Sequence, residues 1–167
     1  MTRRKIPRRS RAADPKLKTA TTIPVRQHSS SAGWPLVFGA WLVASVSTLG
    51  ALFLSEVVQV PPCMLCWVQR IFMFPLVLIL PLGLFPFDPK VARYALALAV
   101  PGALTAAFHL LLVAGVIPER IQPCTQGVPC SEDTFALFGV LSVPMLSALA
   151  FSAIVALAVL AVMRSPK

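Results

Sequence analysis

Four long apolar stretches constrain this chain more than any other feature of its sequence. They cover about residues 34–54, 64–87, 91–117 and 143–163. Each is long enough to cross the ~30 Å hydrocarbon core of a bilayer as a helix that rises ~1.5 Å per residue. A water-soluble domain of 167 residues would not be 57% hydrophobic and only 13% charged. We therefore predict an all-α integral membrane protein, a bundle of four transmembrane helices (residues 34–167) with short external loops that carry two cysteine pairs.

Prolines mark the expected bends and one expected helix start. Pro75, Pro81 and Pro101 fall inside the second and third stretches, where bundled membrane helices tolerate proline, so we expect kinks there. Ser142 is suited to cap the fourth helix, and Pro144 is suited to its first turn.

The N-terminal segment, residues 1–33, differs from the rest of the chain. It is basic, rich in Ser, Thr and Pro, and has no apolar periodicity, so we predict a disordered cytoplasmic tail. The formal net charge of +9 would suit a nucleic acid, but nine of the fifteen basic residues lie before residue 27, beside a nearly uncharged remainder. We therefore expect no nucleic-acid partner. The first apolar stretch exceeds a signal-peptide core, and we expect it to be a retained span.

The distribution of Lys and Arg outside the spans predicts the orientation. Thirteen of these residues lie on one side, which the positive-inside tendency makes cytoplasmic, together with both chain ends. The opposite side receives the connections 55–62 and 118–141, whose single basic residue is Arg120. Both cysteine pairs, Cys63/Cys66 and Cys124/Cys130, are therefore expected outside the cytoplasm, where disulfides can persist.

The segment 62–70 reads Pro-Cys-Met-Leu-Cys-Trp-Val-Gln-Arg and carries the strongest chemical signal. A CxxC at a helix start places thiols beside unpaired backbone N–H groups and the positive end of the helix dipole, which favours thiolate and disulfide exchange. Arg70 follows one turn after Cys66 on the same face. It could stabilise a thiolate or the oxygen of a quinone undergoing reduction, or it could simply extend to the headgroups. Gln69 could add a hydrogen bond or merely pack.

The second pair, Cys124 and Cys130, flanks Gly127 in the connection before the fourth span. A disulfide here would close a small loop, which suits a labile redox bond but also a structural staple. A zinc site made of all four thiolates is a further alternative. It would not account for Arg70 or for a membrane location, so we expect no metal.

His109 lies in the third predicted span, about eight residues from its outer end. With Arg70 it could form a polar pocket for a headgroup between the second and third helices. An interhelical hydrogen bond explains an intramembrane histidine equally well.

Together these features resemble the DsbB-type disulfide bond formation proteins. The resemblance covers nearly the whole chain after residue 33 and rests on the four spans, the CxxC-W-x-Q-R string, the second cysteine pair and Leu-Ser-Val-Pro at 141–144. It implies a bacterial inner-membrane thiol:quinone oxidoreductase that reoxidises a DsbA-like thioredoxin-fold protein and reduces ubiquinone or menaquinone.

The resemblance also implies a relay. Cys124 would form the mixed disulfide with the partner, Cys130 would close it, and electrons would pass to Cys63 through a Cys63–Cys130 link. Cys66 would face the quinone as a thiolate, and Arg70, with Gln69 and His109, would line the quinone site. The short spacing of the second pair and the long basic tail depart from the best-known members of the family.

Two other functions fit parts of the pattern. A relative of vitamin K epoxide reductase is also a four-helix redox protein, but its loop pair precedes the CxxC, the reverse of the order here. A membrane adaptor braced by structural disulfides is the non-enzymatic alternative. A c-type haem site is excluded, because Trp67 stands where CxxCH needs a histidine.

Overall fold

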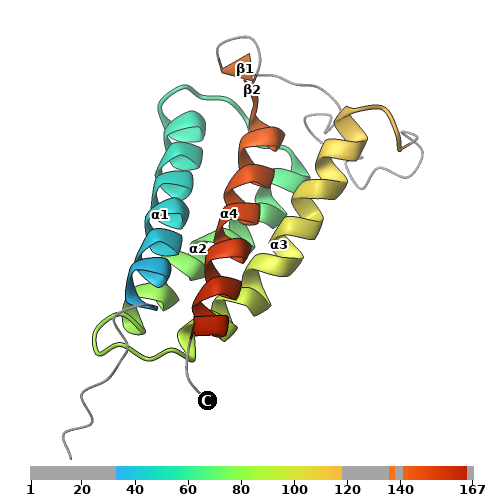
Figure 1. Cartoon of the computed structure of the whole chain (residues 1–167). Helices are drawn as coiled ribbons and strands as arrows, with labels where there is room; N and C mark the ends of the chain where they lie inside the picture. Colours follow the sequence, from blue (N-terminus) through green and yellow to red (C-terminus); the bar gives the residue numbers. More distant parts are fainter. Residues whose placement is uncertain (1–32, 118–135, 138–140, 165–167) are drawn as a thin grey trace, which may run out of the picture.

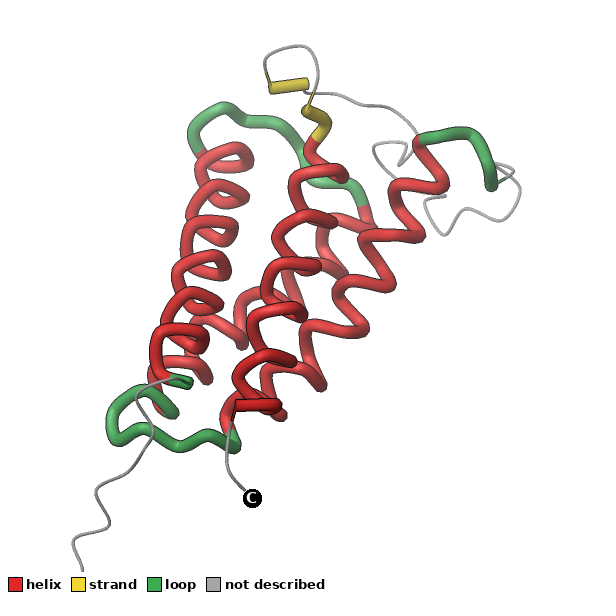
Figure 2. The backbone as a smooth tube through the Cα atoms, in the orientation of Figure 1, coloured by secondary structure: helices red, strands yellow, loops and turns green. Residues whose placement is uncertain are grey.

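The computed structural model describes residues 33–117, 136–137 and 141–164. Four helices make up nearly all of this part of the chain: α1 (Trp34–Glu56), α2 (Met64–Leu82), α3 (Val91–Val113) and α4 (Val143–Arg164). They run alternately up and down (Figures 1 and 2). All four are long and apolar enough to cross a membrane. The predicted class, an all-α four-helix membrane bundle, is confirmed.

The helices are arranged in a closed ring of neighbours. α1 packs against α2 and α4, and α3 packs against the same two helices. Small residues such as Ala44, Ala95 and Ala99 are fully buried in the common core, which lets the helices approach closely. Gly102 of α3 faces the buried ring of Phe151 of α4, so the ring occupies the space that a side chain at 102 would need.

A tryptophan compensates for one of the prolines. Pro81 has no N–H to donate to the carbonyl of Val77, one turn earlier in α2. The indole Nε1 of Trp41, on α1, donates to that carbonyl oxygen at 3.2 Å. The Trp41 indole thus replaces the missing N–H of Pro81, so that α2 tolerates this proline.

Two helices end earlier than predicted. α2 ends at Leu82, not near residue 87, because Gly83 packs directly against Val91 and the chain turns there, with a Phe85–Pro86 cis peptide in the turn. α3 ends at Val113, not at 117. Gly115 has φ +71 and closes a Schellman motif, in which its N–H reaches the Leu112 carbonyl and the next N–H reaches Leu111.

The fourth helix begins at Val143, as the Ser142-Val143-Pro144 sequence predicts. It is preceded by a minimal antiparallel pairing of β1 (Ala136–Leu137) with β2 (Leu141–Ser142). Residues 1–32, with nine basic residues, and 118–135, with Arg120, Cys124 and Cys130, lie outside the described residues.

The two ends of the bundle differ in character. The α1–α2 connection and the start of α4 lie at one end with Cys63, while the α2–α3 connection and the end of α4 lie at the other (Figure 1). Lys90, Arg93 and Arg164 belong to this second end. Among the described residues, this arrangement agrees with the expected separation of the Cys63/Cys66 pair from the basic residues outside the spans.

Candidate functional site

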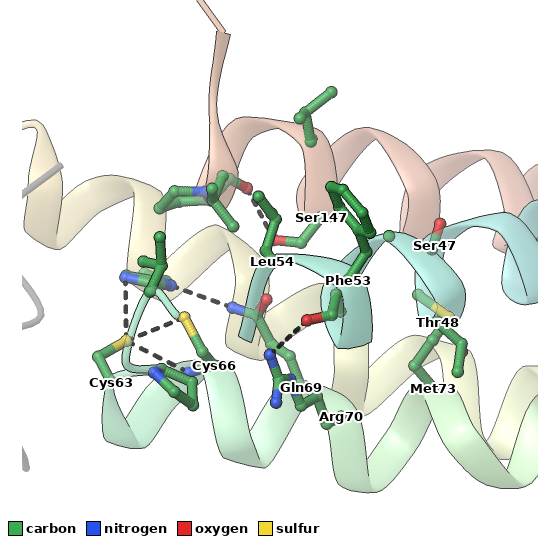
Figure 3. A pocket seen from close by; sticks show the side chains of 18 of the residues that line it. Ser47, Thr48, Phe53, Leu54, Cys63, Cys66, Gln69, Arg70, Met73 and Ser147 are labelled. Carbon is green, nitrogen blue, oxygen red and sulfur yellow. Dashed lines mark hydrogen bonds between the residues drawn. The ribbon is translucent and has the colours of Figure 1, made fainter. Parts of the chain in front are cut away.

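The cysteine pair lies at the start of α2. Two prolines, 61 and 62, keep the preceding chain extended, and Cys63 is the N-cap residue with φ −68 and ψ 169. Its Sγ accepts a hydrogen bond from the backbone N–H of Cys66 at 3.4 Å. The Cys63 thiol donates to the Cys66 sulfur at 3.0 Å, and both cysteines are free, so the structure holds the reduced pair (Figure 3). The predicted position of the CxxC at a helix start is therefore correct.

The groups that stabilise negative charge converge on Cys63. Once ionised, Cys63 can accept a hydrogen bond from the Cys66 thiol, and this bond holds the pKa of Cys63 well below its usual range. His109 and the Cys66 backbone N–H act in the same direction, against the effect of burial. The resemblance assigned the thiolate role to Cys66 at the quinone. In this structure, the groups that favour a thiolate lie around Cys63 instead.

Gln69 and His109 join α2 to α3 beside the sulfurs. Both are buried, with exposed fractions of 6% and 2%, and they are the buried polar side chains of the described residues. Gln69 Nε2 lies 3.2 Å from His109 Nδ1, and His109 Nε2 lies 3.9 Å from Cys63 Sγ. Of the two readings of His109, the interhelical hydrogen bond is present, and Gln69 is its partner. Since α3 ends at Val113, His109 is four residues from the helix end, not eight.

Arg70 is fixed by α1. Its Nη2 donates to the carbonyl of Ala51 at 2.9 Å, and its Cζ lies 5.2 Å from the centre of the Trp67 ring. Ala51 is close to the C-terminus of α1, where the helix dipole favours a cation. The half-buried guanidinium is thus held in place at the cysteine end.

A cavity of ≈ 570 Å³ adjoins these groups. All of Cys63, Cys66, Gln69, Arg70 and His109 line it. The rest of its wall is mainly apolar and comes from α1, the α1–α2 connection, α2 and α4. The labelled wall residues in Figure 3 include Ser47, Thr48, Phe53, Leu54, Met73 and Ser147.

The α1 and α4 walls were not predicted. Residues such as Phe53 and Leu54 look like any other part of an apolar span, so composition gives no signal for them. The proximity of α1 to Arg70 is a tertiary contact, which helical periodicity within α2 cannot reveal.

The site also contains donors that could ligate a metal. The two cysteine sulfurs and a ring nitrogen of His109 all lie within 4.8 Å of one another. The alternative weighed from the sequence used four thiolates, whereas this cluster uses one cysteine pair and a histidine. The other two cysteines of that alternative, Cys124 and Cys130, lie outside the described residues.

Comparison with known proteins agrees with this architecture. The family model described as "Disulfide bond formation protein DsbB" matches residues 34–161. The chain is 52% identical over 119 residues to a "Probable disulfide formation protein" of Metapseudomonas resinovorans, covering 71% of this chain and 83% of that protein. It is 40% identical over 119 residues to "Disulfide bond formation protein C" of Bacillus subtilis (strain 168), covering 71% and 86%. No solved structure gives a significant match.

The family match covers three of the helices fully, most of α4 and the reduced cysteine pair, and the relatives are covered over most of their length. The chain is a multi-pass membrane protein that belongs to the DsbB family of disulfide bond formation proteins.

Proposed function

We propose that the protein is a thiol:quinone oxidoreductase that reoxidises a DsbA-like thioredoxin-fold protein outside the cytoplasm. The observation that carries this proposal is the position of the cysteine pair, which opens onto a largely apolar cavity with Gln69, Arg70 and His109 at the same end. Such a cavity suits a hydrophobic electron acceptor. A disulfide with a purely structural role would need no cavity of this kind beside it.

The cavity fits a quinone such as ubiquinone or menaquinone. Its apolar walls from α1 and α4 suit a ring and the start of an isoprenoid tail, and its polar groups suit carbonyl oxygens. When bound, a quinone takes up two electrons and two protons as two thiols become a disulfide.

Two side chains around the sulfurs would have different roles, Arg70 in charge stabilisation and His109 in proton transfer. Arg70, fixed by the Ala51 carbonyl, presents a permanent positive charge that favours thiolate and a developing oxyanion. His109, tied to Gln69, lies within reach of the Cys63 sulfur and can hold or release a proton there.

Electrons enter from the partner through the second cysteine pair. Reduced partner and oxidised Cys124–Cys130 exchange thiols for disulfide, and Cys63–Cys66 then reoxidises Cys130 and Cys124 in the same way, so each exchange conserves two electrons. A DsbA-type partner has a reduction potential of about −120 mV, while glutathione pools lie at about −200 mV or below. Glutathione therefore cannot keep that partner oxidised. A membrane quinone can serve as the terminal oxidant.

The same function requires a particular location. The cysteine end would face the outside of a bacterial inner membrane, and both chain ends would be cytoplasmic. The basic residues of the α2–α3 connection and of the end of α4 support this orientation.

The test uses purified protein in detergent with quinone and a reduced thioredoxin-fold substrate, and it follows quinol formation. Cys66→Ala and Cys124→Ala should each abolish turnover, and turnover that survives either change would refute the site. Arg70→Ala should raise the quinone KM much more than the partner KM. Arg93→Ala is the matched control, because Arg93 is exposed at the opposite end of the bundle.

A further inference from the structure

The cysteine pair and His109 offer three soft ligand atoms at one point. Cys63 Sγ lies 3.0 Å from Cys66 Sγ and 3.9 Å from His109 Nε2, and all three ligand atoms lie within 4.8 Å of one another. We propose that the reduced pair and His109 form a reversible binding site for Zn²⁺, which holds the two cysteines in the reduced state. This inference rests on the reduced pair and His109 and does not depend on the proposed function.

The distances from the Cys63 sulfur to the Cys66 sulfur and to His109 Nε2 are close to those of a zinc site. Zn–S bonds of ~2.3 Å and Zn–N bonds of ~2.0–2.1 Å in tetrahedral geometry separate the ligand atoms by about 3.5–3.8 Å. The two sulfurs would have to move apart by less than 1 Å, roughly the difference between 3.0 and 3.8 Å. Cys63 is anchored as the N-cap, so a rotation of the Cys66 side chain is the simplest adjustment.

Gln69 supplies the outer support that zinc-bound histidines commonly have. A metal at His109 Nε2 leaves the proton on Nδ1, which must then donate to an acceptor. The Gln69 amide lies 3.2 Å from Nδ1, and an amide can present its oxygen there by rotating about its last bond. The buried Gln69 of α2 thus orients the ligand His109 of α3.

The charges of such a complex balance. One Zn²⁺ replaces the two thiol protons, which are released, and the resulting complex with two thiolates and a neutral imidazole has no net charge. A neutral complex suits a buried position better than a pair of thiolates would. The guanidinium of Arg70 donates to the Ala51 carbonyl, and the neutral zinc complex would not repel its positive charge.

The fourth coordination position would be open, because all three ligands line the cavity. The metal site would exist only when Cys63 and Cys66 are both reduced. A Cys63–Cys66 disulfide has no thiolate to offer, so oxidation would release the metal and bound metal would oppose oxidation. The site would therefore inhibit thiol–disulfide exchange whenever Zn²⁺ binds to the reduced pair.

The experiment measures Cd²⁺ binding directly, by the ultraviolet charge-transfer band of cadmium thiolates, with no quinone or partner present. A Cys124→Ser/Cys130→Ser background in the full chain removes the other thiols. Reduced protein should bind one Cd²⁺ per chain, Zn²⁺ should displace it, and oxidised protein should bind none. Failure of quinone reduction would leave these results unchanged, so the two proposals can fail separately.

Histidine variants test the third ligand. His109→Ala should weaken Cd²⁺ binding by at least about tenfold, and Gln69→Ala by roughly tenfold. His28→Ala is the control, since His28 is the other histidine of the chain and lies in the N-terminal segment. His109→Cys should bind Cd²⁺ again with a stronger thiolate band, which shows that loss in His109→Ala is not a folding defect. Equal affinity in wild type and His109→Ala, or equal binding by oxidised protein, would overturn the site.

Discussion

The contact between Gly102 and Phe151 predicts a sharp penalty for one added methyl group. A Cβ at 102 would lie 2.2 Å from Cε1 and 2.6 Å from Cζ of the Phe151 ring. Ordinary carbon contacts are about 3.5–4.0 Å, so the ring or the helix must move by roughly 1.3 Å, which is 3.5 minus 2.2. Phe151 is fully buried, so it has no free space into which to move.

The size of the penalty follows from a comparison with a second helical glycine. Gly102→Ala overpacks the interface between α3 and α4, at a cost of about 1–3 kcal/mol, but it also gains up to about 1 kcal/mol in helix propensity. Gly39→Ala gains the same propensity on α1, and its new Cβ would meet Leu157 at 3.6 Å, an ordinary contact. The difference in unfolding free energy between the two variants should therefore be about 1–3 kcal/mol.

Unfolding in mixed detergent and dodecyl sulfate micelles, followed by helical circular dichroism, measures that difference. Phe151→Leu in the Gly102→Ala background should recover part of the loss, because the smaller side chain no longer meets the new methyl group. Equal stability of Gly102→Ala and Gly39→Ala would refute the packing argument. So would a double variant whose two losses simply add.

Two further predictions follow from the hydrogen bonds. Trp41→Phe should destabilise the bundle by about 0.6–1.7 kcal/mol in the same unfolding assay. The loss should be much smaller in a Pro81→Ala background, because residue 81 can then donate to the Val77 carbonyl. Equal losses in both backgrounds would contradict the idea that Trp41 compensates for Pro81. Because its pKa is lowered, Cys63 should react with iodoacetamide in mildly acidic buffer, where an ordinary thiol of pKa about 8.5 is protonated, and Cys66→Ala should move the midpoint of this rate toward higher pH. An unchanged midpoint would show that Cys66 does not stabilise the thiolate.

The sequence was sufficient for the fold class and for the position of the CxxC at the start of α2. Uncharged stretches of spanning length leave few alternatives to a helical bundle, and a CxxC after two prolines indicates a helix start. The ends of α2 and α3 were placed too late because apolar residues continue past them. Gly83 and Gly115 end these helices through a close contact and a positive φ, respectively, neither of which changes the hydrophobic pattern.

The environment of the site was harder to predict. Residues 69 and 70 were candidates from their position near the CxxC, but their partners lie on α1 and α3. One of those partners is the backbone carbonyl of Ala51, which has no sequence signature. The α1 and α4 walls of the cavity are apolar in a protein that is apolar throughout, so only the packing of the four helices identifies them.

Two interhelical hydrogen bonds of the described helices hold the cysteine end of the bundle in place. Gln69 to His109 joins α2 to α3, and Arg70 to the Ala51 carbonyl joins α2 to α1. Away from the cysteines, the bundle is held by the packing of apolar side chains, small residues among them, by the close contact at Gly102 and by the hydrogen bond from Trp41 to the Val77 carbonyl. Interhelical hydrogen bonds in membrane proteins contribute only about 0.6 kcal/mol on average, so losing one should leave the fold intact. Substitutions at Gln69, Arg70 or His109 should therefore alter the chemistry at the sulfurs much more than the stability of the bundle.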